Sequence, residues 1–108
     1  GPVMLSEKIE INDQLNYGLL SDQLSILGSK LIIKAIDLID KNKAKFLEQD
    51  HTKATHAKKI TREDEEINWN NNADKIVQQI NGLNPTPGAC FKFKNEPQKI
   101  WLISGISF

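Results

Sequence analysis

The sequence predicts an α/β chain in two parts that are joined by a polar linker. Val3–Ile11 is expected to form a strand, because apolar and polar residues alternate from Leu5 onward. Leucine and isoleucine then recur at helical spacing as far as Ile39. Residues 41–59 are polar and without periodicity, and a second amphipathic helix and two short apolar runs follow them. The expected order is a strand, two helices, a linker, a helix and a β-hairpin.

The composition is that of an ordinary soluble globular protein. The chain has 108 residues, of which 39% are hydrophobic and 26% are charged. Its longest apolar run, Leu31–Ile33, is far shorter than the roughly 20 residues of a membrane helix, and we recognise no signal peptide. The single Cys90 excludes an internal disulfide. We therefore expect a cytoplasmic protein without a membrane partner.

Charge is unevenly distributed along the chain. The formal net charge is zero, which by itself argues against a strong nucleic-acid binder. Residues 41–62, however, hold seven lysine and arginine residues against two acidic residues, for a net charge of +5. Four consecutive acidic residues, 63–66, follow directly. The positive charge is thus concentrated in the middle of the chain.

The first part is expected to contain two helices. Asn16 is a candidate N-cap, because its side-chain oxygen can accept a hydrogen bond from a free amide of the first turn. Gly28 is expected to break or kink the helix, since glycine lowers helix propensity by about 1 kcal/mol relative to alanine. A wide apolar face follows, made by Leu31, Ile32, Ala35, Ile36, Leu38 and Ile39. This face implies burial against a larger body, and the alternative is a helical hairpin that packs on itself.

The second part begins with two capped helical segments. Thr61 and Asp64 approximate a capping box for a helical turn. Asn72 is expected to cap a short helix whose inner face is Ile76, Val77 and Ile80.

Residues 84–88 contain two prolines and must form an irregular corner. The strands expected beyond it are Cys90–Phe93 and Ile100–Ile103, with a turn at Asn95–Pro97.

Several segments occur in an order that is characteristic of one family. They are Gly1–Leu5, Tyr17–Gly28, Thr55–Ile60, Ile67-Asn68-Trp69 and Gly82–Ala89. Together they resemble the methionyl-tRNA formyltransferase family, although that family usually has Asp where this chain has Asn68. The resemblance divides the chain into the C-terminal part of a catalytic domain (1–50), a linker (51–66) and the N-terminal part of a second domain (67–108).

The resemblance implies a fold and an activity. The first part would belong to a Rossmann-like formyltransferase domain, and the second would begin an OB-like barrel. The family transfers a formyl group from 10-formyltetrahydrofolate to the amino group of methionyl initiator tRNA. Its catalytic Asn, His and Asp would all lie upstream of Gly1, so we assign no catalytic, cofactor-binding or metal-ligating residue. The chain is expected to be an inactive fragment, with the missing catalytic segment as a partner in trans.

The basic linker is the candidate contact with initiator tRNA. The resemblance implies that Lys58, Lys59 and Arg62 meet tRNA phosphates, and Lys59 and Arg62 match basic positions of the family best. The alternative is a solvated linker that only maintains solubility, which the adjacent acidic run favours. Two other functions stay open: a non-enzymatic RNA-binding remnant, and a fragment of another folate-dependent formyltransferase.

The remaining aromatic and reactive side chains favour structural roles. Trp69 and Trp101 could stack on bases, but packing inward is the better interpretation. Phe91 and Phe93 are expected on a buried strand face and Cys90 as a small buried residue. His51 and His56 are expected to be exposed linker residues, without the partners that catalysis needs.

Overall fold

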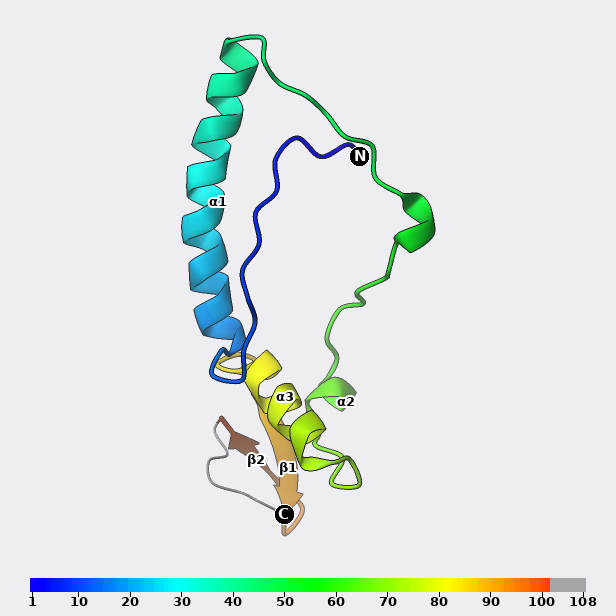
Figure 1. Ribbon diagram of the computed structural model, residues 1–108. Coiled ribbons are helices and arrows are strands. Elements are labelled where there is room, and N and C mark those ends of the chain that lie inside the picture. Colours follow the sequence, from blue (N-terminus) through cyan, green and yellow to red (C-terminus); the bar gives the residue numbers. More distant parts are fainter. Residues whose placement is uncertain (102–108) are drawn as a thin grey trace. The chain divides into compact units, whose positions relative to one another are not determined.

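The computed structural model describes residues 1–101 (Figure 1). Its elements are α1 (Tyr17–Asp40), a 3₁₀ turn η1 (His51–Lys53), α2 (Arg62–Glu65), α3 (Ala73–Leu83), β1 (Ala89–Phe93) and β2 (Glu96–Ile100). The chain forms two compact units. The first unit combines residues 1–10 with 22–58, and the second combines residues 11–21 with the chain from Lys59 onward. The domain limits expected from the sequence remain a prediction.

The N-terminal strand expected at Val3–Ile11 does not form. Only an isolated antiparallel bridge joins Val3 to Leu47, with N–O distances of 2.8 and 2.9 Å. Residues 4–11 make no ladder with a neighbouring segment, and a strand exists only where its backbone groups pair. Alternation of apolar residues therefore indicated extended backbone here, but the prediction of a strand was wrong.

α1 is one continuous helix of 24 residues, so the expected break at Gly28 is also wrong. The cost of one interior glycine is about 1 kcal/mol, which the good helix formers on both sides of it offset. The N-cap prediction is confirmed, because the Asn16 side chain accepts a hydrogen bond from the Leu19 amide at 2.9 Å. The helix ends where Asn42 adopts a left-handed φ of 52° and the Lys43 amide donates to the Leu38 carbonyl at 2.8 Å.

The apolar faces of α1 are exposed within the described residues. None of its residues is buried, and Ile33 and Ile36 are 70% and 60% exposed. This agrees with the expectation that these faces lack a partner in the chain itself. No helix in residues 1–101 has both the length and the apolar character to cross a membrane.

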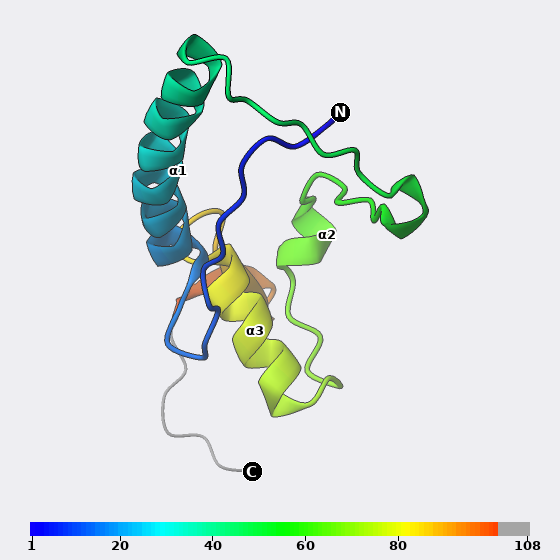
Figure 2. The same ribbon diagram turned by 45° about the horizontal axis from the view of Figure 1, so that its top comes forward.

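The core of the second unit lies between α3 and the hairpin (Figures 1 and 2). It consists of Ile67, Ile76, Ile80, Leu83 and Ala89, with Ile100 packed against it. The predicted inner face of α3 is confirmed for Ile76 and Ile80, and Val77 is half-buried. The predicted caps form as well: Asn72 accepts from the Lys75 amide, and the Asp64 carboxylate accepts from the Thr61 amide, both at 2.9 Å.

The hairpin forms with a different turn from the one expected. β1 and β2 are antiparallel, and the register runs from Ala89 opposite Ile100 to Phe93 opposite Glu96. The turn is therefore Lys94-Asn95, whose φ values of 51° and 65° suit the right-handed twist of the strands. Pro97 lies inside β2 rather than in the turn, which an edge strand tolerates. The predicted strand residues Leu102 and Ile103 lie outside the described part of the chain.

Candidate functional site

The basic stretch of the linker leads directly into α2. Lys58, Lys59 and Arg62 are all exposed, and Arg62 is the first residue of α2. Lys58 ends the first unit, whereas Lys59 and Arg62 belong to the second. Lysine and arginine in an exposed segment can donate to phosphate oxygens without first losing a buried contact. Their proposed contact with tRNA stays a prediction.

α2 is anchored to both α3 and the hairpin. The Gln79 side-chain amide donates to the Asp64 carbonyl at 2.9 Å and to the Glu66 carbonyl at 3.2 Å. The Ile67 amide donates to the Cys90 carbonyl at 2.8 Å, next to a parallel bridge between Glu66 and Cys90. These contacts fix the acidic segment beside β1, although it is only one helical turn long.

Two acidic residues of this segment form ion pairs with hairpin lysines. Lys99 Nζ lies 2.7 Å from Glu65 Oε2 and also donates to the Gly88 carbonyl at 2.8 Å. Lys92 Nζ lies 3.4 Å from Glu66 Oε1. Neither pair has a local signal in the sequence, because the partners of Lys99 and Lys92 lie 34 and 26 residues away. The acidic run thus partly neutralises the lysines of the hairpin.

The proline corner holds the start of α1 and the end of the hairpin together within the second unit. The Gly18 amide donates to the Asn84 carbonyl at 3.0 Å. A Cβ atom on Gly18 would lie 2.7 Å from Pro85 Cδ, so the helix approaches the corner as closely as glycine allows. The Trp101 indole donates to the Pro85 carbonyl at 3.1 Å, and the Asn84 amide donates to the Trp101 carbonyl at 2.8 Å.

The aromatic side chains are more exposed than the sequence predicted. Trp69, Phe93 and Trp101 are 57%, 58% and 48% exposed, so the prediction that they pack inward is wrong. Cys90 and Phe91 are half-buried. The core is filled by aliphatic residues of α3 and the adjoining segments, and α3 covers only part of the two-stranded sheet. The Trp69 and Phe91 rings still meet edge to face, with centroids 5.9 Å apart.

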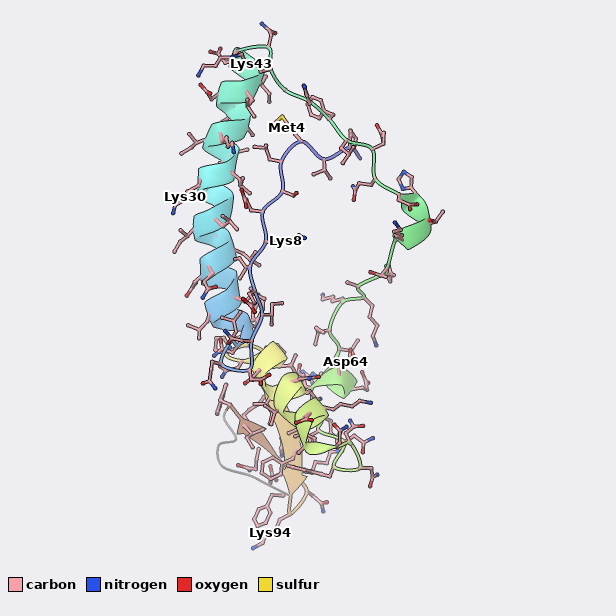
Figure 3. The ribbon with its side chains drawn as sticks, in the orientation of Figure 1. Met4, Lys8, Lys30, Lys43, Asp64 and Lys94 are labelled. Carbon is pink, nitrogen blue, oxygen red and sulfur yellow. The ribbon has the colours of Figure 1, made fainter. Side chains whose placement is uncertain are left out.

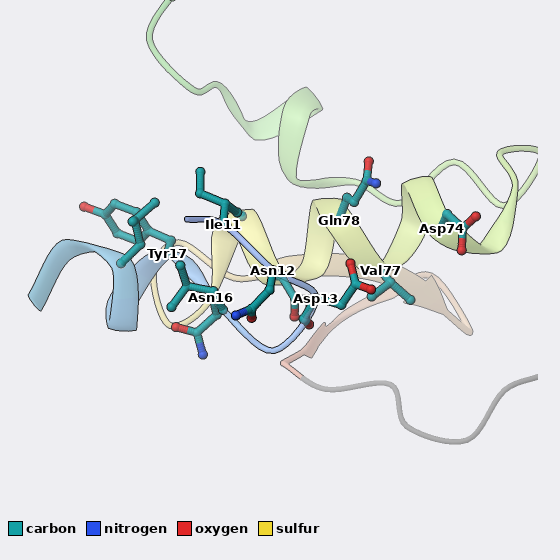
Figure 4. Close-up of a pocket in the computed structure, with 12 residues that line it drawn as sticks. Ile11, Asn12, Asp13, Asn16, Tyr17, Asp74, Val77 and Gln78 are labelled. Carbon is teal, nitrogen blue, oxygen red and sulfur yellow. Dashed lines mark hydrogen bonds between the residues drawn. The ribbon is translucent and has the colours of Figure 1, made fainter. Parts of the chain in front are cut away.

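A groove of about 810 Å³ lies between residues 11–20 and the outer face of α3. Figure 4 shows Asp13, Asp74, Asn12 and Gln78 among its lining side chains. The lining contains two carboxylates and no lysine, arginine or histidine. It is therefore unsuited to a phosphate group or another anion.

The histidines do not take part in a site among the described residues. His51 lies in η1 and His56 in the linker, and both are exposed. Asp50 caps η1, and hydrogen bonds from the Thr52 hydroxyl and amide hold the pKa of its carboxyl below the usual range. In residues 1–101, no three His, Cys, Asp or Glu side chains lie close enough together to hold a metal ion. Figure 3 shows the side chains that extend from the linker, with Asp64 labelled on α2.

Comparisons with known proteins identify relatives along nearly the whole chain. Residues 59–106 match the family described as the formyl transferase C-terminal domain. The chain is 48% identical over 100 residues to a methionyl-tRNA formyltransferase of Pelagibacter ubique, covering 93% of this chain and 32% of that protein. It is 40% identical over 101 residues to the enzyme of Carboxydothermus hydrogenoformans, covering 94% of this chain and 33% of that one.

A third relative extends the match almost to full coverage. The chain is 36% identical over 107 residues to a methionyl-tRNA formyltransferase of Halalkalibacterium halodurans, which covers 99% of this chain and 34% of the relative. The helices and the two-stranded antiparallel sheet agree with a C-terminal formyltransferase domain. The chain therefore belongs to the methionyl-tRNA formyltransferase family and spans about a third of the length of the curated relatives that it matches.

Proposed function

We propose that this chain forms the connection between the two domains of a methionyl-tRNA formyltransferase, and that its second unit begins the tRNA-binding domain. One coincidence carries this proposal. The second compact unit resumes at Lys59, which is also the first residue matched to the formyl transferase C-terminal domain. The first unit would then be the end of a Rossmann-like catalytic domain, and the hairpin would be the first two strands of an OB-like barrel.

The ligand of the second unit is initiator tRNA. Lys58, Lys59 and Arg62 contact its phosphates, because they are exposed and lie just before or at the start of the anchored α2. Each such contact releases counterions from the RNA, so binding weakens steeply as salt rises. The contacts position the tRNA and do not read its sequence.

The chain itself does not transfer formyl groups. In the whole enzyme the methionyl amine attacks the formyl carbon of 10-formyltetrahydrofolate in the cytoplasm, which requires a proton acceptor and stabilisation of the oxyanion. The resemblance assigns these groups to residues upstream of this chain. The part of the reaction that falls to residues 1–108 is to hold the tRNA and link it to the catalytic domain.

A titration with initiator tRNA over a series of KCl concentrations tests this role. The variant Lys58→Gln/Lys59→Gln/Arg62→Gln should bind more weakly and show a salt slope reduced by about two to three, at somewhat under one per lost phosphate contact. The control Lys8→Gln/Lys30→Gln/Lys34→Gln removes the same charge from exposed residues of the N-terminal 40. Equal losses in both variants would show an unspecific effect of net charge and would contradict the proposal.

An assay of formyl transfer separates the enzyme from a binding remnant. We expect no turnover from this chain alone and turnover when a polypeptide with the remaining two-thirds of the Pelagibacter ubique relative is added. Turnover by the isolated chain would contradict our assignment. Binding of tRNA without any complementation would favour the non-enzymatic RNA-binding remnant.

A further inference from the structure

Lys92 of the hairpin forms an exposed ion pair with Glu66, the residue that follows α2. Lys92 lies on β1 opposite Pro97, and its Nζ is 3.4 Å from Glu66 Oε1. The two side chains are 66% and 48% exposed, so water and larger anions can reach both. An exposed ion pair of this kind contributes little to stability, and it opens readily.

The carboxylate is nevertheless held in place through its backbone. The Gln79 amide donates to the Glu66 carbonyl at 3.2 Å, and the Ile67 amide donates to the Cys90 carbonyl at 2.8 Å. These bonds tie residue 66 to α3 and to β1 on its two sides. The backbone of Glu66 therefore stays next to β1, so its carboxylate can return to Lys92 whenever the ion pair opens.

The ion pair between Lys99 and Glu65 is less exposed than the pair between Lys92 and Glu66. Lys99 has two partners, Glu65 at 2.7 Å and the Gly88 carbonyl at 2.8 Å, and the Glu65 side chain is only 19% exposed. Its ammonium group is engaged in holding α2 to the hairpin. Lys92 has one ion-pair partner and its side chain is 66% exposed, against 36% for Lys99, so an incoming anion reaches Lys92 more readily.

We propose that Lys92 is a phosphate-binding residue for RNA and that Glu66 competes with the phosphate for its ammonium group. This inference rests on the proposed tRNA-binding function. Lys94, at the adjoining turn, brings a second cation, whose Nζ lies 5.6 Å from the Phe93 ring centroid. Together with the basic residues before α2, these lysines favour a polyanion over a single carboxylate. The competition lowers the affinity for every RNA by a similar factor.

The test is a titration of the full chain with an initiator tRNA transcript over a series of KCl concentrations. Glu66→Gln removes the competing charge and keeps the size of the side chain, so we expect affinity to rise about two- to fivefold, the equivalent of one surface ion pair. The salt slope should steepen by somewhat under one, for one added phosphate contact. Glu66→Gln/Lys92→Gln should lose this gain.

Asp37→Asn is the matched control, because it breaks an exposed ion pair with Lys41 on α1 and changes the net charge equally. A similar gain in affinity in this control would overturn the inference. So would an affinity that is the same in the original chain and in Glu66→Gln. Neither result would contradict the proposed tRNA-binding function. Binding by neither chain would overturn both. Thermal unfolding checks that the variants fold, and Glu66→Ser provides a second removal of the charge.

Discussion

At Gly18, the packing of the second unit requires a residue without a side chain. Its missing side chain lets the first turn of α1 rest on Pro85, where a Cβ atom would stand 2.7 Å from Pro85 Cδ. Proline Cδ belongs to a rigid ring, so the contact cannot be relieved by a rotamer change. The constraint at this contact is steric: only a residue without a side chain fits.

Gly18→Ala should therefore destabilise the second unit by about 1–3 kcal/mol, the usual cost of forcing extra volume into a packed contact. Urea unfolding followed by tryptophan fluorescence measures this change. Gly82→Ala in α3 is the control, since a Cβ there meets nothing within 4 Å. The control should be neutral or stabilising, because alanine is the better helix former. Equal effects of the two variants would contradict the close approach.

The small core makes Ile80 the most sensitive apolar residue. It is 1% exposed and is the one large side chain among the described residues that is fully buried. Ile80→Ala should cost about 2–5 kcal/mol in the free energy of unfolding, through lost burial and a cavity. Ile33→Ala makes the same chemical change at a position that is 70% exposed and should change stability little. Thermal or urea unfolding of both variants checks the difference.

At the scale of elements, the sequence predicted those features that depend on contacts between residues close together in the chain. The Asn16 and Asn72 caps and the inner face of α3 depend on residues three or four apart, and they were predictable. Gly28 was misleading, because one unfavourable residue cannot outweigh a long helix. The strand expected at Val3–Ile11 does not form, because a strand needs a neighbouring segment to pair with. The alternation of apolar and polar residues cannot reveal that segment.

The candidate site was only half predictable for the same reason. Lys58, Lys59 and Arg62 could be found as a local excess of charge. The ion pairs of Glu65 and Glu66 with the hairpin depend on where the Lys94-Asn95 turn falls. The sequence suggested a turn at Asn95–Pro97, which would pair Lys99 with a different residue of β1.

At the scale of the whole molecule, α1 presents apolar surface that the described residues leave uncovered. The curated relatives are about three times as long as the region that they share with this chain. We therefore expect the isolated chain to self-associate through the exposed faces of α1. Ile33→Lys/Ile36→Lys should shift the elution volume in gel filtration toward the monomer. Monomeric behaviour of the original chain at high concentration would contradict this expectation.

The decisive measurement is the binding of initiator tRNA by the full chain as a function of KCl concentration. We expect binding that weakens steeply with salt, and a shallower slope when Lys58, Lys59 and Arg62 are replaced by glutamine. The same replacement of Lys8, Lys30 and Lys34 should leave the slope nearly unchanged. A chain that binds no tRNA at low salt, or whose slope responds equally to both sets, would contradict the claim.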